Sequence, residues 1–157
     1  MNTRPPMNRN LLIAGLDEAE LFVVYAARMY RGKQQCLCHL FHAAGMCGTQ
    51  SLFIEMQEAL CADEQAGFVA GERGSAALNR QEALLLGALA HWQRHPGDLS
   101  DHALDLLVSP AAGRVAAPLA REFARRLTRA GLVLQLALPA IEQKPCWHSP
   151  ATPSLRH

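Results

Sequence analysis

Apolar residues recur at three- and four-residue spacing along most of the chain, which predicts α-helices rather than strands. We expect an all-α fold, a single-domain bundle of five or six helices over residues 11–138. Residues 1–10 and 139–157 lack this periodicity, and we expect a disordered leader and an irregular tail there. The expected helices are Asp17–Arg31, Gln34–Ala44, a helix capped by Thr49 that runs to Asp63, Asn79–Arg94, a short helix capped by Ser100, and Ala116–Arg129.

The first expected helix is apolar on nearly every side. Its segment Leu21–Ala27 reads LFVVYAA, and a buried strand is the rival interpretation of so short an apolar run. Asp17 as the N-cap, with Glu18 and Glu20 in the first turn, favours the helix. A helix that is apolar all round must be buried, and a small bundle does not easily cover every side of it. We therefore expect a homodimer.

The helix that begins after Asn79 has the clearest start signal in the chain. Asn79 and Glu82 have the spacing of a capping box, in which each side chain accepts a hydrogen bond from a backbone N–H of the other's turn. The helix should end near Arg94, because a proline follows two residues later. The side chains expected in the core are those of Trp92, Phe22, Phe53, Phe123 and Leu89.

The last third of the chain should hold a short helix and a long one. Ser109-Pro110 is expected to end the short helix, which Ser100 begins. The long helix should close at Arg129, with an apolar stripe of Val115, Leu119, Phe123 and Leu127. Pro118 must lie in its first turn or kink it. The apolar segment Leu132–Leu138 is either a short strand or packed coil.

Composition narrows the setting of this fold. A chain of 157 residues matches one domain, and its net charge of +1 gives no overall electrostatic case for nucleic acid or membrane. The N-terminus has no signal-peptide pattern, and no apolar run is long enough to span a bilayer. Five cysteines, an odd number, argue against a complete disulfide framework. We expect a cytoplasmic protein with reduced thiols.

One short stretch of the second expected helix and the turn after it concentrates metal-ligating residues. They are Cys36, Cys38, His39, His42 and Cys47. At about 100° per residue, the apolar stripe of this helix leaves Cys36 and Cys38 on opposite flanks and turns both histidines away from the core. Two pairs then converge, Cys36 with His39 and Cys38 with His42, but all four cannot.

A complete metal site at this stretch therefore needs a further donor. Cys47, Cys61 or a second subunit would have to supply it, for zinc or another transition metal. A second interpretation is a redox-sensing thiol, with Cys38 activated by His42 one turn away. The third is that the cysteines are small semi-buried apolar residues and the histidines a solvated face, and the sequence favours this one.

Two other clusters carry weaker signals. The last long helix is basic, which indicates either an anion or nucleic-acid surface or an ordinary solvated face; no aromatic residues interleave for base stacking, so the solvated face is favoured. Its arginines are Arg114, Arg121, Arg125, Arg126 and Arg129. Near the loop at Pro96, His91, His95 and His102 lie close to Asp98 and Asp101 in the sequence. An aspartate can orient a histidine as a base, but nothing there supplies a nucleophile.

The segment from Leu99 to Val133 resembles, in part, the helix-turn-helix and pre-wing residues of winged-helix regulators. The resemblance is carried by Leu99-Ser100, Leu104, Leu107-Val108-Ser109-Pro110 and Arg129-Ala130-Gly131-Leu132-Val133. It implies DNA binding. The stretch from Ser109 to Gly131 is several residues longer than such a recognition helix, contains Pro118, and is not followed by a basic hairpin.

The sequence favours a non-enzymatic interaction or regulatory module over an enzyme. It contains no P-loop, no dinucleotide-binding glycine pattern, no nucleophile elbow and no zincin motif, and no glutamate stands three residues before a histidine. In this hypothesis the chain needs no cofactor, and its partner is another protein or a second copy of itself. The alternatives are a metal-binding or thiol-responsive protein that uses Cys36–Cys47 and, second, a degenerate winged-helix DNA binder.

Overall fold

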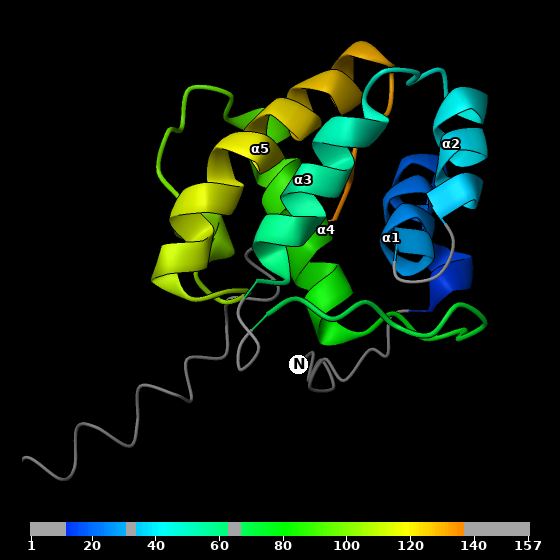
Figure 1. Cartoon of the computed structure of the whole chain (residues 1–157), viewed down its shortest axis with the longest axis horizontal. Helices are drawn as coiled ribbons and strands as arrows, with labels where there is room; N and C mark the ends of the chain where they lie inside the picture. Colours follow the sequence, from blue (N-terminus) through cyan, green and yellow to red (C-terminus); the bar gives the residue numbers. More distant parts are fainter. Residues whose placement is uncertain (1–11, 31–33, 63–66, 137–157) are drawn as a thin grey trace, which may run out of the picture.

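The computed structural model describes residues 12–30, 34–62 and 67–136 of the chain. These ranges form an all-α bundle without strands, apart from one isolated bridge between Leu12 and Ala77 (Figure 1). The helices are α1 (Glu18–Tyr30), α2 (Gln34–Ala43), α3 (Gln50–Leu60), α4 (Arg80–Arg94) and α5 (Pro110–Arg129), with two 3-10 turns, η1 (Ile13–Gly15) and η2 (His102–Leu104). The predicted fold class is confirmed, while the leader 1–10 and the tail 139–157 lie outside the described residues.

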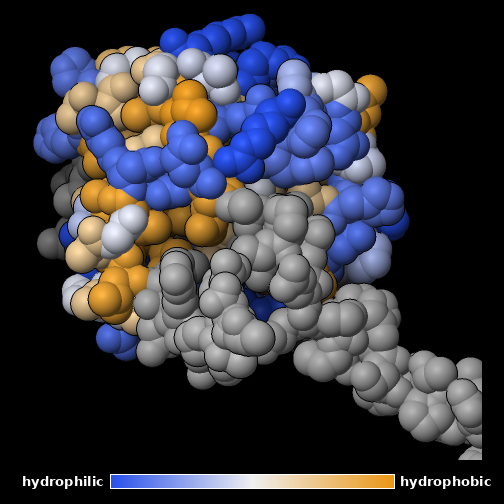
Figure 2. All heavy atoms as spheres, turned by 180° about the vertical axis from the view of Figure 1, so that it is seen from behind, coloured by the Kyte–Doolittle hydropathy of each residue, from blue (hydrophilic) through white to orange (hydrophobic). Residues whose placement is uncertain are grey.

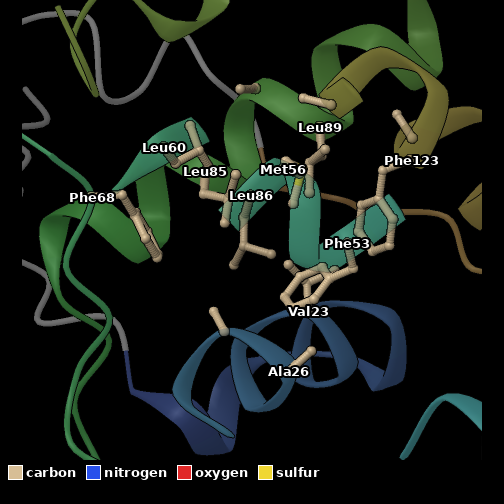
Figure 3. Packing of buried hydrophobic residues seen from close by; sticks show 14 of the residues in the cluster. Val23, Ala26, Phe53, Met56, Leu60, Phe68, Leu85, Leu86, Leu89 and Phe123 are labelled. Atoms are coloured by element: carbon tan, nitrogen blue, oxygen red, sulfur yellow. The ribbon is translucent and has the colours of Figure 1, made fainter. Parts of the chain in front are cut away.

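The helices form two groups that share one core. The long helix α5 packs along α3 and α4, and α1 and α2 pack against each other beside them (Figure 1). Four phenylalanines, one from each of α1, α2, α3 and α5, join the two groups: Phe22, Phe41, Phe53 and Phe123, with ring centroids 5.0–6.4 Å apart. Figure 3 shows Phe53 and Phe123 of this cluster beside the leucines of α4. Such ring pairs contribute about 0.5–1.5 kcal/mol each beyond their buried area.

Helix α1 is the central, heavily packed helix that its sequence predicts. Asp17 and Glu20 form a reciprocal cap: the Asp17 carboxylate accepts from the Glu20 N–H at 2.9 Å, and Glu20 accepts from the Asp17 N–H at 3.1 Å. Within Leu21–Ala27, only Leu21 and Tyr25 retain contact with solvent. The chain's own helices therefore cover α1, and its apolar character gives no separate reason for a second subunit.

Helix α4 begins where the sequence predicts and lies in the core. Asn79 accepts from the Glu82 N–H at 2.7 Å and Glu82 accepts from the Asn79 N–H at 3.0 Å, which is the predicted capping box. The expected core residues are all at most 5% exposed: Trp92, Phe22, Phe53, Phe123 and Leu89. Gly45, with a φ of 74°, follows the end of α2.

The last long helix begins six residues before its predicted start. Ser109 does not end a helix; it caps α5 by accepting from the Ala112 N–H at 3.3 Å, and Pro110 is the first helical residue. Pro118 consequently lies in mid-helix, where it cannot donate to the Arg114 carbonyl. Both residues are on the exposed face, so water can satisfy that carbonyl. Val115 was wrongly assigned to the core stripe and is 61% exposed.

Three further expectations differ from the structure. Ser100 caps no helix, because its hydroxyl donates to Asp98 at 2.7 Å and only the 3-10 turn η2 follows. Thr49 precedes α3 without a side-chain capping bond, since its backbone is already helical. Residues 132–136 are irregular, and the remainder of the proposed C-terminal strand lies outside the described part. Finally, no helix in the described ranges is long and apolar enough to cross a membrane.

Candidate functional site

The Cys/His stretch lies on α2 and the turn after it, with its faces divided as the helical wheel predicts. Leu37 and Phe41 are fully buried, whereas Cys38, His39 and His42 are exposed. The side chain of Cys36 lies outside the described residues, so the expected Cys36–His39 pair does too. The two histidines face solvent and not the core.

The described thiol within hydrogen-bonding distance of His42 is that of Cys47, not that of Cys38. Nδ1 of His42 lies 3.1 Å from Sγ of Cys47, and both side chains are exposed. Cys61, at the end of α3, donates instead to the Phe68 carbonyl at 3.4 Å. Among the residues whose side chains are described, this stretch brings no three ligand atoms together; the one such group is Asp101, His102 and Asp105, which is largely exposed.

Of the histidines and aspartates that the sequence places near the loop after α4, His91 and Asp98 form a pair. Nε2 of His91 lies 2.7 Å from the Asp98 carboxylate, and the side chains are 27% and 30% exposed. The hydrogen bonds from His91 and from the hydroxyl and N–H of Ser100 hold the pKa of Asp98 well below its usual range. Because the Ser100 hydroxyl donates to the same carboxylate and not to the imidazole, these residues do not form a nucleophile–base pair.

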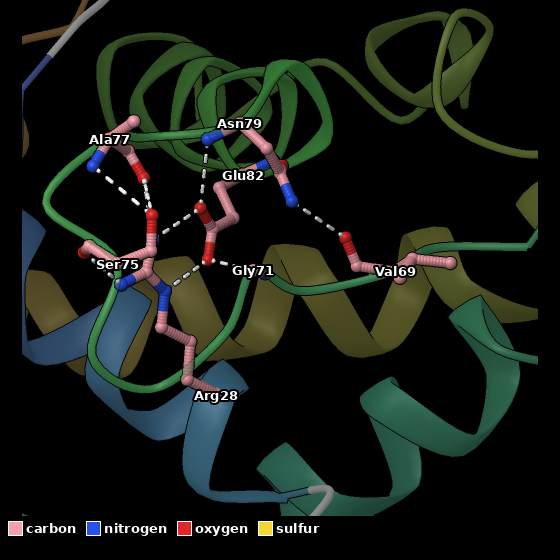
Figure 4. Close-up of polar contacts among 7 residues, drawn as sticks. All are labelled: Arg28, Val69, Gly71, Ser75, Ala77, Asn79 and Glu82. Atoms are coloured by element: carbon pink, nitrogen blue, oxygen red, sulfur yellow. Dashed lines mark hydrogen bonds and ion pairs between the residues drawn. The ribbon is translucent and has the colours of Figure 1, made fainter.

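A buried polar centre lies between α1 and α4, and the sequence did not predict it (Figure 4). Arg28 and Glu82 form a two-pronged ion pair at 2.6 and 2.9 Å, with side chains 2% and 1% exposed. Arg28 also donates to the carbonyls of Ser75 and Ala77, both at 2.9 Å, and the Gly71 N–H donates to Glu82 at 2.9 Å. This centre fastens the loop 67–79 to two helices.

The pKa shifts in this polar centre follow from its contacts. The hydrogen bond to Glu82 raises the pKa of Arg28 despite its burial. Burial alone would raise the pKa of Glu82, but the hydrogen bonds from Arg28, Asn79 and Gly71 outweigh it and lower that pKa. Every polar atom of the ion pair is thus compensated, which is typical of a structural site.

A wide apolar hollow lies where α1, α2 and the end of α5 meet. Its volume is about 600 Å³. Its lining residues are mainly apolar: Leu21, Phe22, Tyr25, Leu40, Ala43, Ala44, Ala130, Gly131 and Leu132, with Glu18 at the N-terminus of α1. Figure 2 shows hydrophobic residues gathered on the side of the molecule where α1 and α2 lie. The sequence missed this hollow because its walls come from three segments that are distant along the chain.

The segment that resembles winged-helix regulators folds as η2 followed by the 20-residue α5. Of the apolar residues that carry the resemblance, Leu104, Leu107 and Val108 are buried, whereas Leu99 and Val133 are 76% and 49% exposed. After Arg129, the described residues 132–136 contain no strand of a wing.

Comparison with protein-family models, with curated proteins and with solved structures gave no match, so neither a family nor a function comes to this chain from a relative.

Proposed function

We propose that this protein is a non-enzymatic interaction module that binds an apolar helix of a partner protein in the hollow between α1, α2 and α5. The observation that carries the proposal is the hollow itself, about 600 Å³ and lined mainly by apolar side chains. An amphipathic helix places apolar residues at i, i+3, i+4 and i+7 into a groove of this kind.

The shape of the hollow favours a different protein over a second copy. In a two-fold dimer the same patch of both subunits meets itself. Two hollows facing each other leave each other's space unfilled, whereas a convex helix fills one. Glu18, exposed at the rim, suits a partner helix with a lysine or arginine beside its apolar face.

Affinity capture with matched variants tests the proposal. Ala43 is exposed on α2 and lines the hollow, so Ala43→Arg should block the groove without disturbing the core. Ala111→Arg adds the same side chain at an exposed position of α5 away from the hollow. We expect a partner retained by the wild type and Ala111→Arg and lost from Ala43→Arg, with a peptide of one of its helices competing for binding.

Sedimentation over a range of concentrations tests whether the protein forms a homodimer. We expect a monomer. A dimer that Ala43→Arg dissociates would overturn the proposal in favour of self-association, and a partner held equally by all three forms would place the binding surface elsewhere.

The contact between His42 and Cys47 favours a second candidate, a thiol-responsive or metal-binding protein. An imidazole nitrogen 3.1 Å from a thiol is placed to act as its general base when the sulfur attacks an electrophile. We expect Cys47 to react with iodoacetamide several-fold faster in the wild type than in His42→Gln. Elemental analysis of protein purified without chelator or affinity tag tests the metal alternative at Cys36, Cys38, His39, His42 and Cys47; stoichiometric zinc or another transition metal would support it.

A further inference from the structure

A second, smaller pocket lies between the C-terminal part of α4 and the outer face of α5. Its volume is about 160 Å³, and Trp92 and Pro96 line it on one side. On the other side stand Arg121, Arg125 and Arg129, which follow one another at four-residue spacing and therefore share a face of α5. The pocket is separate from the apolar hollow and from the Cys/His stretch.

The three arginines differ in how their charges are balanced. Arg121 donates to the carbonyls of Leu99 and Ser100 at 3.2 and 3.1 Å, which holds its guanidinium in place without neutralising it. Arg125 forms an ion pair with Glu122, which also forms one with Arg126. Arg129 has no ion pair among the described residues. Within the described ranges, the charges of Arg121 and Arg129 at the pocket are thus uncompensated.

Trp92, which lines the pocket, carries a buried donor without a partner among the described residues. In the part of the chain that the structure describes, two buried side-chain polar atoms make no hydrogen bond, and the indole nitrogen of Trp92 is one of them. Trp92 is 2% exposed, and the guanidinium of Arg121 lies 5.9 Å from its ring centroid. The Trp92 ring therefore lies beside a guanidinium that lines the pocket, so the signal of its indole N–H can report an anion bound there.

We propose that this pocket binds the phosphate group of a small molecule. Phosphate oxygens match the planar forks of arginine. The ends of α4 and α5 carry a partial negative charge of about one half each, which the two uncompensated arginines outweigh. Trp92 is too buried to stack on a base, so the geometry favours a small phosphate compound over a nucleic-acid strand.

Titration with inorganic phosphate, read by NMR at the indole N–H of Trp92, tests this. Trp147→Phe identifies the signal, since Trp92 and Trp147 are the two tryptophans of the chain. We expect a saturable shift of the Trp92 signal, and a similar one with a phosphate monoester such as glycerol phosphate. Loss of one charge-assisted hydrogen bond in Arg129→Gln should raise the Kd at least about tenfold.

Arg114→Gln is the matched control, because Arg114 is exposed on the same helix but does not line the pocket. Its Kd should stay within about twofold of the wild type. The proposal is overturned if chloride at equal ionic strength produces the same shift, or if Arg114→Gln weakens binding as much as Arg129→Gln does. Tighter binding of a dicarboxylate such as succinate would overturn the assignment to phosphate. Arg129 is exposed, so the Arg129→Gln variant should keep the wild-type melting temperature.

Discussion

Two arginine sites of this protein use the same side chain in opposite ways. Arg28 is 3% exposed, and its guanidinium donates to Glu82 and to two backbone carbonyls that all belong to the chain. At the α4–α5 pocket, Arg129 is exposed and has no ion pair among the described residues. The degree to which hydrogen-bonding capacity is already used separates an arginine that holds the fold from one that is available to a ligand.

The largest expected effect on stability comes from removing Arg28, whose guanidinium is already fully engaged within the protein. Arg28→Met leaves the Glu82 carboxylate buried without its charge partner, which should lower the free energy of unfolding by about 3–5 kcal/mol. The matched control is Arg125→Met, which breaks an ion pair whose members are 54% and 30% exposed and should cost at most about 1 kcal/mol. Urea denaturation measures both. Equal losses in the two variants would show that burial does not distinguish these sites.

The sequence explains Arg28 and Glu82 separately but does not predict the ion pair between them. Glu82 is identifiable from its spacing to Asn79, because a capping box is local. Arg28 lies near the end of α1, where a basic residue is already explained by the helix dipole. The two residues are 54 positions apart, and only the packing of α1 on α4 brings them together. Local signals thus account for the helices and the core, and tertiary packing for this pair.

The same limit applies to the candidate sites. Proximity in sequence drew attention to the Cys/His stretch, yet the helix turns Leu37 and Phe41 inward and leaves Cys38 and His42 exposed. The basic face of α5 is visible in the sequence, but Trp92, which makes it a pocket, belongs to α4. The sequence favoured a solvated face there because no aromatic residue stands between the arginines.

The next largest effect on stability is expected at Gly71, where the loop 67–79 comes close to the Arg28–Glu82 ion pair. A Cβ at Gly71 would lie 2.9 Å from Nη2 of Arg28 and 3.1 Å from Oε1 of Glu82, so Gly71→Ala must displace a buried, fully bonded group. We expect a loss of about 1–3 kcal/mol. Gly74→Ala, in the same loop with nothing within 4 Å of its Cβ, should change stability by less than about 0.5 kcal/mol. Thermal and urea unfolding of both variants will show whether the side chains of the ion pair can shift to make room for the added methyl group.

A smaller effect is expected from acid. The folded-state pKa of Glu82 is lowered, so its contribution is fully present above the unfolded-state pKa of about 4.3 and is lost as pH falls through the folded-state value. Unfolding free energies from pH 7 down to pH 2 should show the wild type more stable than Glu82→Gln at neutral pH. The two curves should converge below about pH 4. A difference independent of pH would mean that the carboxylate charge contributes nothing to the centre.

The smallest effect is expected on the exposed side of α2. Cys38→Ser and Cys47→Ser alter side chains that face solvent, so each should change the free energy of unfolding by less than about 0.5 kcal/mol. Leu37→Ala, next to Cys38 but 0% exposed, should cost about 2–5 kcal/mol. Urea denaturation in the presence of reductant measures all three. A large loss in Cys47→Ser alone would show that its contact with His42 stabilises the turn after α2. The pair would then hold the fold, as Arg28 does, and would not resemble the exposed Arg129, which is available to a ligand.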